Sequence, residues 1–325
     1  MFWVALPAEL AASVEKLLYH CDPVALKESV RRLKERYVEG RAPLGAGSMS
    51  QVDALAYAGY RLPATYGALE GVLGAVQDVA MELSPQTLLD VGAGPGTGIW
   101  AFTEWFSSIR RVTALEREPA MRRLGQALLG RALNPVLQEV DWRPEDLMRV
   151  SLTPHQVVLA SYVVGELPEQ DVVRVANKLW RAAESLLVVV EPGTPGGFGR
   201  IRQVRDTLLA QGAHIIAPCP HDHACPMQGG DWCHFSQRVA RSRRHKQLKG
   251  AVAPFEDEKY SYVALTRAPV AERRSRILRH PQVETGKVRL RLCEVEGLTE
   301  VVVSQRQGDS FRRARKAQWG GSWEP

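Results

Sequence analysis

The sequence of 325 residues lacks any apolar run near the roughly 20 residues that a membrane helix needs, so no membrane partner is expected. Its first residues, MFWVALPAELAASVEKLL, also lack a basic segment followed by a long apolar one, and acids already occur at Glu9 and Glu15. Neither a secretory signal nor an Arg-rich transit peptide is therefore indicated. We expect a bacterial cytoplasmic protein, and a monomer because no oligomer signature is visible.

Cysteine is scarce, with five residues, and no two of them form the C-x-x-C pair that is usual in zinc knuckles. Cys219, Cys225 and Cys233 nevertheless lie within fifteen residues, and Cys293 lies on a later predicted strand. In a cytosolic protein such a cluster suggests metal binding rather than disulfides. Four thiolates would hold zinc or an iron–sulfur cluster, and the wide gaps between them leave room for a larger inorganic core. Buried free thiols are the structural alternative.

Acidic residues are sparse in the last third of the chain. Residues 238–316 contain 20 Lys and Arg against 9 Asp and Glu, whereas the whole chain carries a net charge of +6. A basic surface on a mildly acidic body is typical of polyanion binding, with RNA the natural candidate and a solvated basic face the alternative. The residues expected to contact RNA are Arg238, Arg241, Arg243, Arg244, Lys246, Arg312, Arg313, Arg315 and Lys316.

From residue 87 onward, strand-like and helix-like segments alternate, which favours a parallel sheet with helices on both faces. The expected strands are 87–92, 111–116, 135–140, 156–163, 185–192, 214–219 and 260–267. The expected helices are 97–108, 119–130, 145–150, 169–183 and 197–211. Seven strands in this order match the α/β fold of the class I methyltransferases, a Rossmann-like sheet whose last strand is antiparallel.

The two ends of the chain differ from this pattern. Helical spacing predicts helices over 14–21 and 22–40, with Asp22 as the N-cap and Gly40 as the stop. Pro63 should break or restart a helix in the stretch that follows. Beyond residue 280, alternating apolar residues predict a small β hairpin.

The segment LLDVGAGPGTG combines a buried strand with a glycine-rich turn before a helix. Gly92, Gly94 and Gly96 allow the backbone to turn sharply and to approach a ligand closely. Asp90 at the end of the strand suits the cationic amino-acid end of S-adenosylmethionine. Glu116 ends the second strand, where a carboxylate can accept both ribose hydroxyls. We expect an S-adenosylmethionine site, with an NAD site or a packing turn as the alternatives.

Catalytic residues are harder to find. The segment ASYVVGELPEQ, after the fourth strand, lacks the Asn/Asp-Pro-Pro-aromatic motif of amino-group methyltransferases and the cysteine of cytosine C5 enzymes. Tyr162 and Glu166 are polar groups at a suitable place and are the candidates for catalysis.

These elements divide the chain into three parts. We expect a helical cap over 1–80 and an S-adenosylmethionine-binding domain over 81–268, with a Cys-rich insertion at 217–250. A basic β extension over 269–325 would close the metal site.

Several long motifs together resemble one family. They are YRLPATYGAL, LLDVGAGPGTG, VVEPGTPGGF, PHDHACPMQGGDWCHFSQRVARSRRHKQLKG, FEDEKYSYVALTR and the closing WGGSW. They are similar to the Rsm-type methyltransferase-like family of the small ribosomal subunit, found in bacteria and mitochondria. The resemblance runs from about residue 55 to the C-terminus.

The resemblance implies a factor that binds the small ribosomal subunit and its rRNA and acts in its maturation. It further implies that Cys219, Cys225, Cys233 and Cys293 hold a 4Fe–4S cluster. Two other functions stay open. One is an active S-adenosylmethionine-dependent rRNA methyltransferase, and the other is a zinc-stabilised RNA-binding protein with a vestigial cofactor pocket.

Overall fold

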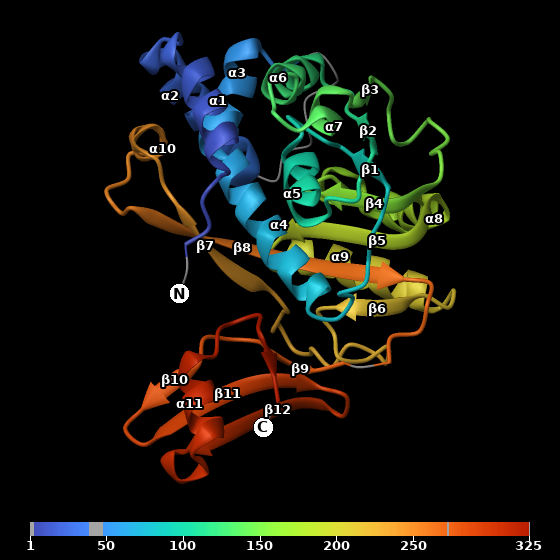
Figure 1. The fold of residues 1–325 in the computed structure, drawn as a ribbon, viewed down its shortest axis with the longest axis vertical. Coiled ribbons are helices and arrows are strands. Elements are labelled where there is room, and N and C mark those ends of the chain that lie inside the picture. The colour runs from blue at the N-terminus through green and yellow to red at the C-terminus, as the bar shows by residue number, and fades with distance from the viewer. Residues whose placement is uncertain (1–2, 39–47, 272, 325) are drawn as a thin grey trace.

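The computed structural model describes residues 3–38, 48–271 and 273–324. The fold is built around a central β-sheet. The sheet has eight strands, of which seven lie in the order β3-β2-β1-β4-β5-β8-β6 (Figure 1). These strands are β1 (Thr87–Val91), β2 (Arg111–Leu115), β3 (Asp141–Arg143), β4 (His155–Ser161), β5 (Ala183–Pro192), β6 (His214–Ala217) and β8 (Phe255–Thr266). The eighth, β7 (Phe235–Ala240), pairs with β8.

Strands β1 to β5 pair in parallel, and β8 runs antiparallel between β5 and β6. The central strands read as continuous apolar runs because both faces of the sheet are covered. Val188 and Val190 of β5 pack with one hydrophobic cluster, whereas Leu187 and Val189 pack with the other. This strand order is that of the class I methyltransferases, so the predicted fold class is confirmed.

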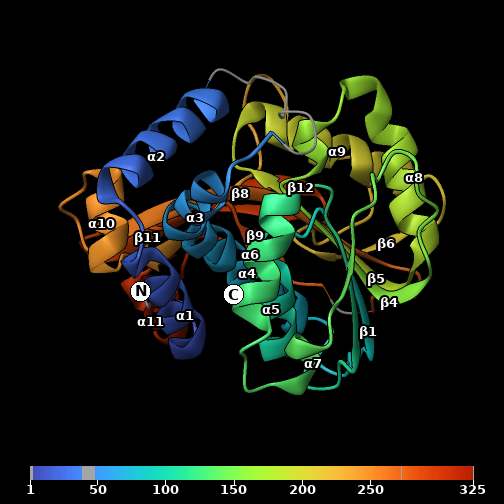
Figure 2. The same ribbon diagram turned by 90° about the horizontal axis from the view of Figure 1, so that it is seen from above.

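Helices cover the two faces, as Figure 2 shows from above. The first face carries α4 (Leu62–Gln77), α5 (Thr97–Trp105) and α6 (Pro119–Leu129). The second face carries α8 (Val172–Ala182) and α9 (Pro195–Leu209). None of the helices in the described part of the chain is long and apolar enough to cross a membrane.

The N-terminal helices pack beside α4 and α6. They are α1 (Ala8–Tyr19), α2 (Pro23–Val38) and α3 (Gln51–Tyr60). The Asp22 carboxylate accepts the N–H groups of Val24 and Ala25, which confirms the predicted cap of the second helix. Pro63 lies in the first turn of α4 and separates it from α3, as expected. Gly40, the predicted stop, lies outside the described residues.

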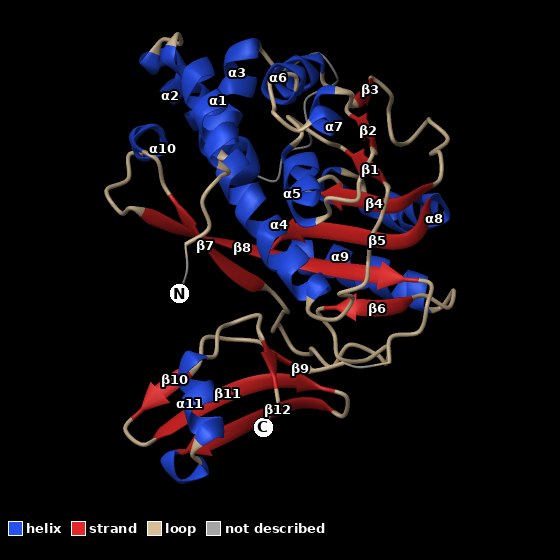
Figure 3. Cartoon of the chain, viewed as in Figure 1, coloured by secondary structure: helices blue, strands red, loops and turns tan. Residues whose placement is uncertain are grey.

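A second sheet forms the C-terminal part of the chain (Figure 3). Its strands are β9 (Ser275–Ile277), β10 (Gln282–Glu284), β11 (Lys287–Glu294), β12 (Gly297–Ser304) and β13 (Ser322–Trp323). Strands β11 and β12 form the predicted hairpin, and α11 (Asp309–Lys316) packs against it. The inward side chains Val288, Leu290 and Leu292 give this sheet a hydrophobic core of its own.

Two predicted elements are wrong. Residues 135–140 form no strand but the short helix α7 (Pro135–Gln138), because Asn134 caps it and Pro135 has the fixed φ of a first helical residue. The third strand begins only at Asp141, and residues 145–150 form turns instead of a helix. Strand β7 and helix α10 (Arg243–Lys249) were not predicted.

Candidate functional site

The glycine loop joins β1 to α5 at the carboxyl edge of the sheet. Gly92, Gly94 and Gly96 all have positive φ angles, of 71°, 54° and 81°. A Cβ atom at Gly92 would lie 2.7 Å from the Val163 side chain, whereas a Cβ atom at Gly94 would meet nothing within 4 Å. Gly92 is therefore required by packing and by φ, and Gly94 leaves open space above the loop.

Asp90 lies beneath this loop with a solvent exposure of 0%. Neither oxygen of its carboxylate has a hydrogen-bond partner among the described residues. Burial, together with the charge of Glu116, raises the pKa of Asp90 to about 8. A buried acid without a partner is unfavourable by itself, so the site is suited to a cationic ligand group that would pair with it.

Glu116 follows β2 and supports the loop from the other side. Its carboxylate accepts the N–H of Gly94 at 2.8 Å and the N–H of Glu118 at 2.7 Å. Burial raises its pKa, and the two N–H groups oppose that shift. Each oxygen has one further acceptor position, so the carboxylate can also receive ligand hydroxyls. The structure therefore brings together the residues predicted to bind the cofactor, namely Asp90, Glu116 and the three glycines.

Tyr162 and Glu166, the candidates for catalysis, follow β4. Tyr162 has a φ of +58°, and its hydroxyl donates to Glu258 at 3.2 Å. Burial and the Glu258 carboxylate raise the pKa of Tyr162 well above its usual value, so the phenol stays protonated. Glu166 is exposed in a short 3-10 turn, Val164–Glu166. A catalytic role for either residue stays a prediction.

Sequence reasoning missed Glu191, which lies near the end of β5 with a solvent exposure of 0%. Burial raises its pKa to about 7, and the nearby backbone N–H groups of Gly165 and Val164 oppose that shift. A Cβ atom at Gly165 would lie 2.5 Å from its Oε2. The signal was present in the sequence, because Glu191 ends an apolar strand before Pro-Gly much as Asp90 ends one before the glycine loop.

The four clustered cysteines line one cavity of about 30 Å³ between the two sheets. Cys219, Cys225 and Cys233 come from the connection between β6 and β7, and Cys293 comes from β11. Burial raises the pKa of the Cys219 and Cys233 thiols, and it raises the pKa of Cys293 to about 12. Cys21 lies elsewhere, where its thiol donates to the Leu17 carbonyl.

The surroundings of these thiols suit an anionic metal–thiolate centre. Apolar side chains, among them Met227 and Leu278, form much of the cavity wall. Arg205 and Arg276 also line it, and the charge of both lowers the pKa of Cys219 against the larger effect of burial. Within the described residues, no group of three His, Cys, Asp or Glu side chains is arranged to hold one metal ion. The donor set and its charge environment therefore fit a thiolate-bound cluster.

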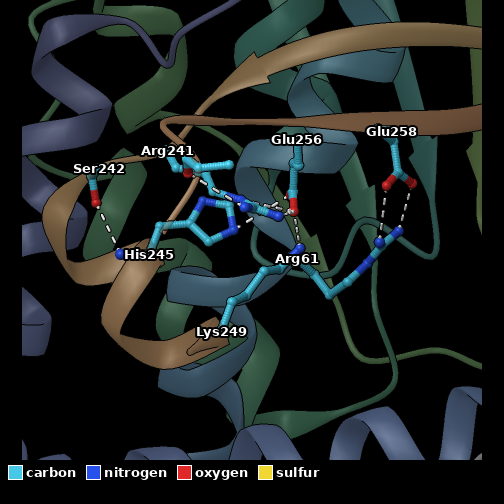
Figure 4. A network of polar contacts seen from close by, with 8 residues as sticks. Arg61, Arg241, Ser242, His245, Lys249, Glu256 and Glu258 are labelled. Atoms are coloured by element: carbon cyan, nitrogen blue, oxygen red, sulfur yellow. Dashed lines mark hydrogen bonds and ion pairs between the residues drawn. The ribbon is translucent and has the colours of Figure 1, made fainter. Parts of the chain in front are cut away.

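The predicted RNA-binding residues divide into those that contact another side chain and those that form no ion pair in the described part of the chain. Arg238 forms a bidentate ion pair with Asp257, at 2.7 and 2.9 Å, and Arg241 pairs with Glu256 at 3.0 Å (Figure 4). Arg312 pairs with Asp309, and Arg313 donates to Ser310. The other predicted residues form no ion pair within the described ranges: Arg243, Arg244 and Lys246 on α10, and Arg315 and Lys316 on α11.

Comparison with known proteins identifies relatives of this chain. A family model described as mitochondrial small ribosomal subunit Rsm22 matches residues 51–324. The human mitochondrial ribosome assembly protein METTL17 is 29% identical over 286 residues, which cover 82% of this chain and 61% of that protein. The mitochondrial Rsm22-cox11 tandem protein 2 of Schizosaccharomyces pombe is 26% identical over 378 residues, which cover 98% of this chain and 50% of that protein. The chain thus spans about half to three fifths of the length of these relatives.

Solved structures give weaker likenesses. Magnesium protoporphyrin IX methyltransferase of Synechocystis, with bound S-adenosylmethionine, is 11% identical at a TM-score of 0.42, covering 72% of this chain and 90% of that one. Precorrin-6y C5,15-methyltransferase of Geobacter metallireducens is 15% identical at a TM-score of 0.39, covering 61% and 87%.

The relatives correct one expectation. The matched family and both curated relatives are described as mitochondrial, so the prediction of a bacterial cytoplasmic protein is wrong. That prediction depended on the composition of the first residues alone.

Proposed function

Because the chain belongs to the Rsm22 family of mitochondrial small ribosomal subunit proteins, we propose that it is an assembly factor of that subunit and binds its rRNA. The human relative is itself described as a ribosome assembly protein. The basic residues of α10 and α11 supply the surface for RNA, because five of their cations have no ion-pair partner within the described residues. Arginine suits this role since its planar fork donates two parallel hydrogen bonds to a phosphate.

We further propose that the glycine loop binds S-adenosylmethionine. Asp90 would hold the cationic amino-acid end, and Glu116 would accept the ribose hydroxyls. The support is the buried Asp90 carboxylate without a partner, together with the open space above Gly94. When bound, this cofactor supplies a reactive methyl group. The chain's own residues would bind and orient it.

The proposal rests mainly on one observation: four cysteines line the same cavity in a chain of this family. We propose that Cys219, Cys225, Cys233 and Cys293 hold a 4Fe–4S cluster. Three of these ligands belong to the connection after β6, and the fourth belongs to the C-terminal sheet. The cluster would therefore join the two sheets covalently and stabilise the fold, because metal binding contributes directly to the free energy of folding.

The test is anaerobic purification followed by a visible absorption spectrum and analysis of iron, sulfide and zinc. The wild type should be brown, with about four irons and four sulfides per chain. Cys225→Ser should lose most of the absorbance and the iron. Cys21→Ser is the matched control, because this thiol lies outside the cavity and should leave both unchanged.

Other results would select the alternatives. A colourless protein with one zinc per chain would replace the cluster by a structural zinc site. Transfer of a labelled methyl group to small-subunit rRNA, lost in Asp90→Ala, would establish an active methyltransferase. Failure of the wild type to co-sediment with small subunits would contradict the assembly function itself.

A further inference from the structure

A second cavity, of about 240 Å³, lies between the N-terminal helices and α10, and no cysteine lines it. We call it the α10 cavity. Its walls are formed by apolar side chains of α1, of the segment before it and of the α3–α4 junction, namely Leu6, Val14, Leu18, Ala58 and Pro63. An apolar cavity of about 150 Å³ is already large enough to bind benzene. The α10 cavity is therefore large enough for a purine or pyrimidine ring.

Polar groups line one side of this cavity. His245 is only 2% exposed, and its Nε2 lies 3.4 Å from Glu256 Oε1 (Figure 4). Its Nδ1 has no hydrogen-bond partner among the residues that the structure describes. Glu15 also lines the cavity, and its carboxylate accepts the hydroxyl of Ser242 at 2.9 Å. A buried ring nitrogen without a partner is unfavourable unless a ligand supplies one.

One cation without an ion pair in the described residues lines the same cavity. Arg244 lines it, and Arg243 and Lys246 are its neighbours on α10. None of the three forms an ion pair within residues 3–38, 48–271 and 273–324. Arg241 differs, because its guanidinium is bound to Glu256. A purely apolar ligand would leave His245 Nδ1 and Arg244 without partners, whereas a nucleotide carries a ring, hydrogen-bonding edges and a phosphate.

We propose that the α10 cavity takes up one unstacked nucleotide of single-stranded RNA. The base would lie among the apolar side chains with its polar edge toward His245 and Glu15, and Arg244 would bind the adjoining phosphate. Single-stranded RNA is commonly recognised through bases that leave the stack and enter such pockets. The inference rests on the proposed rRNA binding and makes it more specific, because it assigns the place where a base is held.

The test compares two neighbouring alanines of α1. Ala11 lines the cavity, whereas Ala12 is exposed and does not. Ala11→Phe should fill the cavity and weaken binding of a fluorescein-labelled single-stranded RNA of about 12 nucleotides by roughly tenfold. Ala12→Phe should bind as the wild type does. Thermal unfolding of both variants shows whether the fold is kept.

A second variant keeps the test informative if Ala11→Phe does not fold. Arg244→Gln should lower the slope of log affinity against log salt by about 0.7, the value for one phosphate bound in single-stranded RNA. Equal affinity of Ala11→Phe and wild type would overturn the inference, as would an unchanged slope in Arg244→Gln. Binding of 8-anilinonaphthalene-1-sulfonate in the cavity without displacement by the RNA would also overturn it.

The two proposals fail in different ways. If the wild type binds neither the RNA nor small subunits, the proposed function is wrong and this inference fails with it. If the wild type binds both and the Ala11→Phe variant binds them equally well, only the α10 cavity is wrongly assigned.

Discussion

Asp90 shows how a single buried acid can link stability to pH. Its folded-state pKa is about 8, whereas an unfolded Asp titrates near 3.9. Between these values the unfolded chain is ionised and the folded chain keeps its proton. Without ligand, the wild type should therefore lose stability as the pH rises from about 4 to about 8.

We predict that Asp90→Asn removes this loss. In urea unfolding without ligand, the variant should be more stable than the wild type at pH 8 and should approach it at pH 5. It should also bind S-adenosylmethionine far more weakly in calorimetry, because an amide cannot pair with the cationic end of the ligand. Asp78→Asn, at an exposed position on the same chain, is the control. If the free energy of unfolding depended on pH in the same way in the wild type and in Asp90→Asn, the prediction would be contradicted.

At the residue scale, the sequence identifies the glycine loop because that signal is local. Asp90 and the three glycines lie within seven residues, so strand, turn and ligand group are read together. Cys293 is different, since its approach to Cys219 depends on the position of a whole second sheet. Spacing alone could only suggest it as the fourth ligand, and the family resemblance was needed to assign it.

At the element scale, the hairpin of β7 and β8 explains why Arg238 and Arg241 are paired. Arg238 is the register partner of Asp257, and Arg241, which directly follows β7, pairs with Glu256. The sequence predicts both arginines to bind RNA because they belong to the basic run that follows Cys233, and that role stays a prediction. Cross-strand register cannot be read from composition, and register decides which charges meet.

Glu256 holds this hairpin to α10. Burial would raise its pKa, but the close contacts with His245 and Lys249 lower it well below its usual range. Its ionised form therefore contributes stability above the usual Glu pKa, about 4.3, and that contribution is lost as the pH falls. Glu256→Gln should reduce the free energy of unfolding by about 3 kcal/mol at pH 7, because Arg241 and Lys249 lose their buried partner.

Urea unfolding at pH 7 and pH 3 checks this prediction. The difference between Glu256→Gln and wild type should narrow at pH 3. Glu300→Gln is the control, because its ion pair with Arg289 is exposed and should contribute less than about 1 kcal/mol. An equal loss in both variants would show that Glu256 acts as an ordinary surface charge.

At the scale of the whole molecule, the C-terminal sheet lies beside the connection between β6 and β7, which carries three of the cysteines (Figure 1). Asp231, two residues before Cys233, accepts hydrogen bonds from Arg279 and from Arg291 of β11. Trp319 donates its indole N–H to the His234 carbonyl at 2.9 Å. The predicted β extension thus contacts the cysteine-bearing connection, although the division into domains at residues 80 and 268 stays a prediction.

We expect the basic surplus of the last third to serve both the stability of the fold and the proposed RNA binding, and experiments can separate the two roles. Arg241 is bound to a buried carboxylate, whereas Arg243 is exposed and has no ion pair in the described part of the chain. Arg241→Gln should lower the free energy of unfolding by roughly 2 kcal/mol and leave the salt dependence of RNA binding nearly unchanged.

Arg243→Gln should do the reverse. The slope of log affinity against log salt should fall by about 0.7 for each phosphate that the variant no longer binds, while the stability changes by less than about 0.5 kcal/mol. Fluorescence anisotropy at several salt concentrations and urea unfolding measure the two effects on the same protein. If both variants changed only stability, α10 would not bind phosphate, and the RNA surface would have to lie on α11. If Arg241→Gln changed the slope as much as Arg243→Gln, the ion pair with Glu256 would open when RNA binds.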